Sequence, residues 1–225
     1  MEFEALVRSR KSVRGYKSEP VPRRMIDEIL EVAKGAPSSM NSQPWHVHVL
    51  TGRPLERVRE RNTEMMLAGA KPKRDILTHA PYEGVHRERQ VAIAKQLFSA
   101  MGIAREDKPR RQDWVMRGFR QFDAPVSLVL TYDRVLDPGA TPHFDLGALS
   151  YGIVLAAWDR GLGTVVNGQG IMRSDIVREE AGIPEDEVIM TCIAMGYSDD
   201  EFSANAVKSE REPNDGFVRY VGFED

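Results

Sequence analysis

Hydrophobic positions recur with two different spacings along this chain. In residues 20–37, PVPRRMIDEILEVAKGAP, apolar side chains return every three or four positions, which predicts a helix that ends at Gly35. In residues 46–50, HVHVL, polar and apolar side chains alternate, which predicts a strand with one buried face. Residues 125–133, PVSLVLTYD, and 188–198, VIMTCIAMGYS, are apolar almost throughout and predict strands at the centre of a sheet.

Helical spacing also predicts three further helices, over residues 2–9, 144–160 and 174–184. The stretch from about 54 to 120 is charged and mostly helical, with interruptions at prolines, and the tail is strand-like over residues 217–221. No internal repeat or flexible linker divides the chain. We therefore predict one domain of mixed α and β structure over residues 1–225, with a helical excursion at about 60–120 that is a candidate lid over a site.

The composition excludes several classes of protein. The chain of 225 residues is 41% hydrophobic and 29% charged, as globular proteins are, and its net charge of −3 provides no basic face for nucleic acid. No segment approaches the roughly eighteen apolar residues that a membrane span requires. The first residues, MEFEALVRSR, lack the apolar core of a secretion signal. We expect a cytoplasmic protein with neither a membrane nor a nucleic-acid partner.

Motifs for several kinds of chemistry are absent. The glycines of GLGTVVNGQG have the wrong spacing for a dinucleotide fingerprint, and GALSYG lies within a predicted helix rather than at a nucleophile elbow. Cys192 lies in an apolar run, which indicates a buried core thiol. The histidines lack metal-ligand spacing apart from one alternating pair; they are His46, His48, His79, His86 and His143. An enzyme with this sequence would depend on an organic cofactor.

Two polar stretches are candidates for binding a ligand. The first, RSRKSVRGY at residues 8–16, gathers arginines, whose forked donors suit phosphate oxygens, around Ser12. The alternative is a solvated basic helix end, because cations also favour a helix C-terminus. The second, APSSMNSQPW at residues 36–45, is either an ordinary polar turn or a loop that hydrogen-bonds a polyhydroxylated ligand.

Together these stretches carry a family resemblance. RKSVRGYKSEPVPRRMIDEILEVAKGAPSSMNSQPWHVHVL resembles the N-terminal signature of the FMN-dependent nitroreductase family, and the likeness continues through DLGALSYGIVLAAWDRGLGT to SEREPNDGFVRYVGF. Its helical middle is most similar to the nitroaromatic and nitrobenzoate reductase branch. The resemblance implies an α+β fold with a central, mostly antiparallel β-sheet flanked by helices, a helical insertion, and a domain-exchanged homodimer with FMN at the subunit interface.

The resemblance also implies roles for individual residues. The phosphate and ribityl end of FMN would be held by Arg10, Lys11 and Ser12. The partner subunit would supply Pro37, Ser38, Ser39 and Asn41. The backbone along the isoalloxazine would come from Asn167, Gly168 and Gln169. Arg211 would close on the phosphate, with Lys208 as its competitor, while Arg14 would be structural and paired with a carboxylate. Tyr82, Arg120 and Phe122 are candidates for the substrate pocket, and NGQG and Asp123 depart from the family pattern.

The chemistry that the resemblance implies is a ping-pong reaction. NADH or NADPH would pass hydride to flavin N5, and a small aromatic acceptor would then be reduced from nitro to hydroxylamine. No catalytic side chain and no metal are required. Reductive dehalogenation and quinone or enone reduction on the same fold are alternatives. An FMN-binding protein without turnover is another, which bulk around Phe122 over the flavin would favour.

Overall fold

The centre of the protein is one four-stranded antiparallel sheet. The computed structural model describes residues 1–76 and 80–223. The strands lie in the order β1 (Trp45–Leu50), β2 (Val126–Asp133), β4 (Glu187–Tyr197) and β3 (Leu162–Val166). The apolar segments of the sequence therefore form the two central strands, β2 and β4, as predicted. The register shifts between Leu130 and Thr131, where β4 has one extra residue, Met190, opposite β2.

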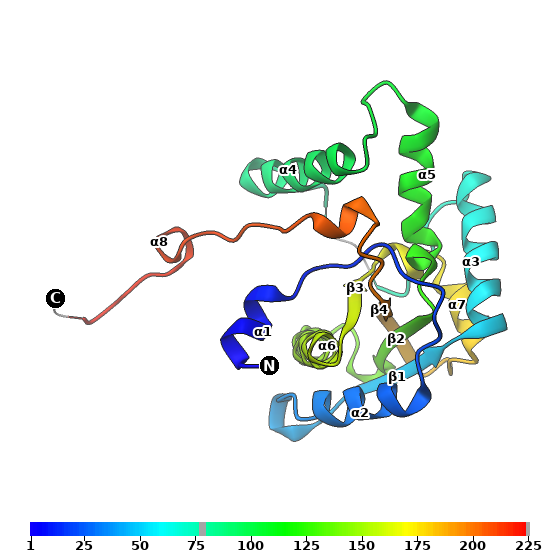
Figure 1. Cartoon of the computed structure of the whole chain (residues 1–225). Coiled ribbons are helices and arrows are strands. Elements are labelled where there is room, and N and C mark those ends of the chain that lie inside the picture. The colour runs from blue at the N-terminus through cyan, green and yellow to red at the C-terminus, as the bar shows by residue number, and fades with distance from the viewer. Residues whose placement is uncertain (77–79, 224–225) are drawn as a thin grey trace.

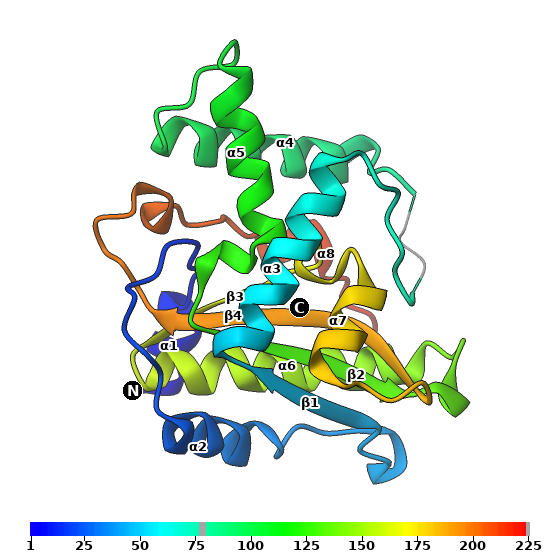
Figure 2. The ribbon, with the colours of Figure 1, turned by 90° about the vertical axis from the view of Figure 1, so that its right-hand side faces the viewer.

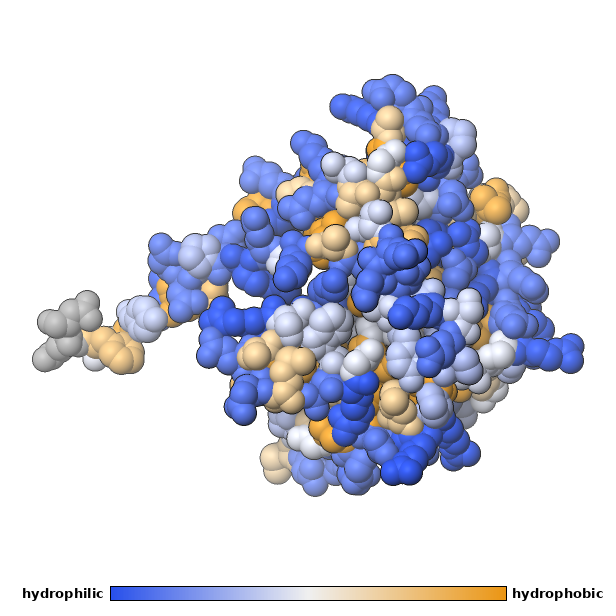
Figure 3. Space-filling model, in the orientation of Figure 1, coloured by the Kyte–Doolittle hydropathy of each residue, from blue (hydrophilic) through white to orange (hydrophobic). Residues whose placement is uncertain are grey.

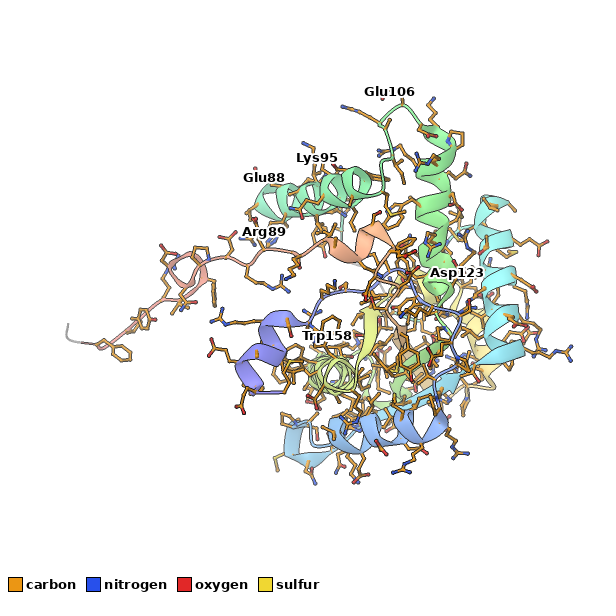
Figure 4. All side chains as sticks on the ribbon, viewed as in Figure 1. Glu88, Arg89, Lys95, Glu106, Asp123 and Trp158 are labelled. Carbon is orange, nitrogen blue, oxygen red and sulfur yellow. The ribbon has the colours of Figure 1, made fainter. Side chains whose placement is uncertain are left out.

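One face of the sheet is covered by α6 (Thr141–Asp159) and α2 (Arg23–Ala33), and α1 (Phe3–Ser9) packs on the outer side of α6. The long helix α6 lies against the sheet, with α2 beside it and α1 at its C-terminal end (Figure 1). The main core forms here, where the apolar stripe of α2 and the buried side of α6 meet β2 and β4. On the other side of α6, Trp158 Nε1 donates to Ser9 Oγ at 3.0 Å and ties α1 to the helix (Figure 4).

The other face is covered by the helical middle of the chain and by α7 (Ser174–Ala181). Helices α3 (Gly52–Leu67), α5 (Lys108–Phe119) and α7 lie side by side over the sheet (Figure 2). A second core cluster, which includes Leu55, Val58 and Val177, packs between α3, α7 and the strands. Helix α4 (Gly84–Ala100) stands further out, and Leu97 is its one buried residue in the described part of the chain. Helices α3, α4 and α5 occupy most of the stretch at about 60–120 that the sequence indicates as helical.

The chain ends in an arm that leaves the body. After β4 come a short turn, η5 (Ser203–Ala206), and a single helical turn, α8 (Asn214–Phe217). The described residues after α8 form no helix or strand. The prediction of a strand over residues 217–221 is wrong, because the described residues after α8 are not paired with any strand. Figure 3 shows the arm projecting from the body. The aromatic side chains of Tyr220 and Phe223 near its end are exposed.

Candidate functional site

The stretch RKSVR, residues 10–14, starts the site, and we call it the basic corner. Helix α1 ends as Arg10 leaves helical geometry, with φ −57° and ψ 132°. The Val13 amide donates to the Thr164 carbonyl at 2.9 Å, and Ser12 forms a parallel bridge with Thr164. Because β3 is an edge strand with unpaired backbone groups, the basic corner is held against the free edge of the sheet.

A depression of about 860 Å³ lies over the basic corner, between α1, α4, α6 and the chain after η5. We call it the cationic depression. Cations from both ends of the chain line it, namely Arg8, Arg10, Lys11, Arg14, Lys208 and Arg211. Arg211 and Lys208, the two C-terminal candidates for a phosphate contact, therefore line the same depression as the N-terminal candidates of the basic corner. A smaller hollow of about 270 Å³ shares Arg10, Ser12 and Tyr151 with the depression and continues along β3 to Val166.

The charges in this depression are incompletely neutralised. Arg10 Nε is buried and has no hydrogen-bond partner in the described part of the protein. Arg14 was expected to pair with a carboxylate, but no ion pair involves it among the described residues; its Nη1 donates to the Ser12 carbonyl at 3.4 Å. Burial lowers the pKa of the Arg14 guanidinium. A site of this kind favours an anion, and the donors present suit a phosphate group.

The segment after β3, residues 167–169, is tied down on both sides. Asn167 is buried, donates from Nδ2 to the Gly118 carbonyl at 2.8 Å and accepts from the Gln169 amide at 3.1 Å. The side chain of Gln169 lies against Gly118, where a Cβ would overlap it. Both side chains are thus turned toward α5. The main chain is held as well, because the Asn167 amide donates to the Cys192 carbonyl at 2.7 Å. Hydrogen bonds of backbone and side chains therefore fix residues 167–169 just beyond β3.

The polar loop after α2 lies in a different depression. Pro37, Ser38 and Ser39 line a hollow of about 540 Å³ together with residues at the start of α6. The loop is held by the buried carboxylate of Asp145, whose two oxygens each accept from the Ser39 amide at 3.2 Å. Asn41 ends the turn η1 (Ser39–Asn41) with a φ of 58°. The loop is therefore ordered, but it does not line the cationic depression of its own chain.

The candidates for the substrate pocket are not brought together. Phe122 is buried in a small core cluster with Ala124, Val165 and Ala194. Arg120 lines a hollow over α3. Tyr82 is exposed just before α4, with its ring centroid 6.3 Å from that of His86.

The unusual acid Asp123 has a partner within the subunit. Its carboxylate lies 3.2 Å from Arg117 Nη1 and 3.3 Å from Arg120 Nε (Figure 4). These two ion pairs join the end of α5 to the turn η2 (Gln121–Asp123). They account for an acid at this position without a contact to substrate.

The middle segment borders the cationic depression through α4. Ile93 lines the depression, and Arg89 Nη2 lies 2.7 Å from Glu212 Oε1 on the C-terminal arm (Figure 4). The labelled Arg89 points from α4 toward the arm. Helix α4 is therefore a wall of the site and is joined to the chain that carries Lys208 and Arg211.

Other chemistry finds little support in the described residues. Burial raises the pKa of the Cys192 thiol to about 12, so it is not a nucleophile at neutral pH. No group of three or more metal-ligating side chains occurs in residues 1–76 and 80–223, and His79 lies outside them. Within the same ranges, no helix is both long and apolar enough to cross a membrane.

Comparison with known proteins agrees with this geometry. The family model described as "Nitroreductase family" matches residues 7–197. The chain is 35% identical to the chloronitrobenzene nitroreductase of Comamonas testosteroni, over 97% of this chain and 96% of that protein. It is 33% identical to the nitrobenzene nitroreductase of Ectopseudomonas oleovorans, with the same coverage. The crystal structure of the FMN and NADPH-dependent nitroreductase NfnB from sphigopyxis sp. strain HMH has a TM-score of 0.93 at 27% identity, over 99% of this chain and 100% of that one.

Proposed function

This chain belongs to the nitroreductase family, and from that premise we propose that it is an FMN-dependent NAD(P)H oxidoreductase that reduces nitroaromatic acceptors. The observation that carries the proposal is the cationic depression beside β3, with the buried and unpartnered Arg10 Nε in its wall. The printed activities of two relatives, chloronitrobenzene and nitrobenzene nitroreductase, support the choice of acceptor. The NADPH dependence of a structural neighbour supports the electron donor.

The residues that line the two hollows suit both parts of FMN, the phosphate and the ribityl chain with its ring. Arg10, Lys11 and Ser12 would bind the phosphate from one side, and Lys208 or Arg211 from the other. The smaller hollow would take the ribityl chain and the ring along β3 toward the backbone of residues 167–169. When bound, FMN supplies the two-electron chemistry, so no nucleophilic side chain is required.

Arg14 is the residue to which we assign a role that the sequence did not indicate. Its guanidinium lines the depression, is half-buried and has no carboxylate partner among the described residues. A fixed positive charge in a partly desolvated site favours a bound anion. We assign Arg14 to the phosphate end of FMN, beside Arg10, Lys11 and Ser12.

We further propose a homodimer in which the loop at Pro37, Ser38, Ser39 and Asn41 serves the partner's site. The loop lies in a depression separate from the cationic one, and the arm projects from the body with exposed aromatic side chains. The exposed Phe144 and Tyr151 on α6 would be covered in such a dimer. The cytoplasmic location, the closure of residues 60–120 over the site and the substrate contacts of Tyr82 and Arg120 stay predictions.

The rival function, FMN binding without turnover, was favoured by the bulk expected of Phe122 over the flavin. Phe122 packs inside the subunit, which withdraws that support. The test is an anaerobic absorption spectrum of the purified protein before and after NADPH, followed by nitrobenzene. We expect a flavin spectrum that bleaches with NADPH and recovers with nitrobenzene. Bound flavin that stays oxidised with both NADPH and NADH would refute the proposal.

A further inference from the structure

A buried asparagine joins the two ends of the chain at the site. Asn205 lies in η5, is 2% exposed, and uses both ends of its side-chain amide. Its Oδ1 accepts from the Arg14 amide at 2.7 Å and from the Gly15 amide at 3.2 Å. Its Nδ2 donates to the Gly15 carbonyl at 2.8 Å and to the Asp199 carbonyl at 2.9 Å. One side chain thus fixes the backbone at the end of the basic corner.

The neighbours of Asn205 strengthen this junction. Phe202 packs so closely on Gly15 that a Cβ there would overlap its ring. The Arg117 guanidinium lies 4.7 Å from the centroid of the Phe202 ring, and Arg117 Nη2 donates to the Arg14 carbonyl at 3.1 Å. In Figures 1 and 2 the turn after β4, in orange, lies against the chain that leaves α1, in blue. The contact is therefore a packed and hydrogen-bonded joint rather than a single bond.

Asn205 also determines where the C-terminal cations begin. Two residues after it, the chain enters the wall of the cationic depression, which it lines from Val207 to Arg211. The cations of residues 10–14 form the facing wall. A change at Asn205 would therefore alter the separation of the two groups of donors, although Asn205 itself does not line the depression.

We propose that Asn205 is a positioning residue for the phosphate group of FMN, an inference that rests on the proposed function. It acts by holding the N-terminal cations, residues 10–14, and the C-terminal cations, Lys208 and Arg211, at the spacing that one phosphate requires. The ring-binding backbone of residues 167–169 is anchored elsewhere, through Asn167 to Gly118. Loss of Asn205 should therefore weaken phosphate recognition and leave ring recognition in place.

The experiment compares FMN with riboflavin, which has the same ring and ribityl chain but no phosphate. Dissociation constants of both are measured by fluorescence titration of apoprotein from the wild type and from Asn205→Ala. We expect the preference for FMN over riboflavin to fall at least about tenfold, since groups that orient direct ligands are typically worth 10–100-fold in metal sites. The riboflavin constant itself should change by less than about threefold, because the ring contacts persist.

A purely structural role makes a different prediction, and Val58→Ala provides the matched control. Val58 is fully buried in the core cluster between α3 and β2, away from the basic corner, so its truncation lowers Tm without touching the joint. The FMN preference of this variant should equal that of the wild type. If Asn205→Ala is insoluble, Asn205→Ser enters the same comparison. Its side chain is neutral and too short to reach both the backbone at Gly15 and that at Asp199.

The outcomes separate the two proposals. If the wild type binds neither flavin, the proposed function fails. If the wild type prefers FMN and the Asn205 variant keeps that preference, or loses affinity for both flavins equally, the positioning role is wrong while the function stands. The positioning role is supported if the Asn205 variant loses affinity for FMN but not for riboflavin, and Val58→Ala does not.

Discussion

Arg10→Ala tests the cationic depression most directly. Arg10 is half-buried, its Nε lacks a partner among the described residues, and its guanidinium lines both hollows of the site. A hydrogen bond to a charged group contributes about 1.5–3 kcal/mol. At about 1.4 kcal/mol per tenfold, the variant should bind FMN roughly 10- to 150-fold more weakly.

The chain offers a matched control in Arg8→Ala. Arg8 lines the same depression, but it is 76% exposed and its Nε is already paired with Glu4 Oε1 at 2.7 Å. Exposed charges of this kind contribute about 0–1 kcal/mol, so FMN affinity should fall by less than about fivefold. The two variants remove the same charge from the same depression and differ in burial and pairing.

The assay is titration of apoprotein with FMN by flavin fluorescence, together with thermal unfolding of the apoprotein. Arg10→Ala should leave the Tm of the apoprotein unchanged or slightly raised, because it removes a charge from a cluster of like charges. An equal loss of affinity in Arg8→Ala and Arg10→Ala would show that overall charge matters and the geometry of Arg10 does not. Full FMN affinity in Arg10→Ala would refute the assignment of the phosphate site.

Three further predictions concern the stability of the elements around the site. Asp145→Ala should destabilise the apoprotein by about 1–3 kcal/mol in urea unfolding, because the Ser39 amide loses a charged acceptor; an unchanged midpoint would contradict the role of Asp145. Arg173 hydrogen bonds lower the Asp175 pKa from 3.8 to about 2, so Asp175 contributes stability above pH 3.8 that is lost as the pH falls toward 2. After allowance for solvent screening, Asp175→Asn should cost about 1 kcal/mol at pH 7, a difference from wild type that shrinks between pH 4 and 2 in urea titrations. Gly163→Ala should cost about 1–3 kcal/mol and weaken FMN binding, since its Cβ would lie 2.7 Å from Val13 Cβ and push the basic corner off β3. Gly147→Ala, with no atom within 4 Å of its Cβ, is the control for the stability change.

The periodic parts of the molecule could be predicted from the sequence, and the contacts between distant residues could not. Strands β2 and β4 are apolar because they are buried at the centre of the sheet, and the stripe of α2 records the face that it buries. The basic corner was visible as a cluster of arginines. Asn205 was not, because one polar residue in a turn has no period, and its partners Arg14 and Gly15 lie 191 and 190 residues away in the sequence.

Two local errors have the same origin. Arg14 was expected to pair with a carboxylate, as most half-buried arginines do, but its surroundings among the described residues contain only a backbone acceptor. Alternating side chains at residues 217–221 have the spacing of a strand, but a strand requires a neighbour, and the arm has none within the described part of this subunit. The spacing of side chains indicates which face of a segment can be buried, but the tertiary structure determines whether another element lies against that face.

The joint between residues 14–15 and residue 205 has a consequence for the order of events during synthesis. The basic corner is translated about 190 residues before the side chain that fixes it, and long-range contacts of this kind form slowly. A ribosome-bound chain that has not yet reached Asn205 therefore cannot assemble the cationic depression. We expect cofactor uptake to follow the synthesis of this residue, so that flavin occupancy distinguishes chains that contain the joint from chains truncated before it.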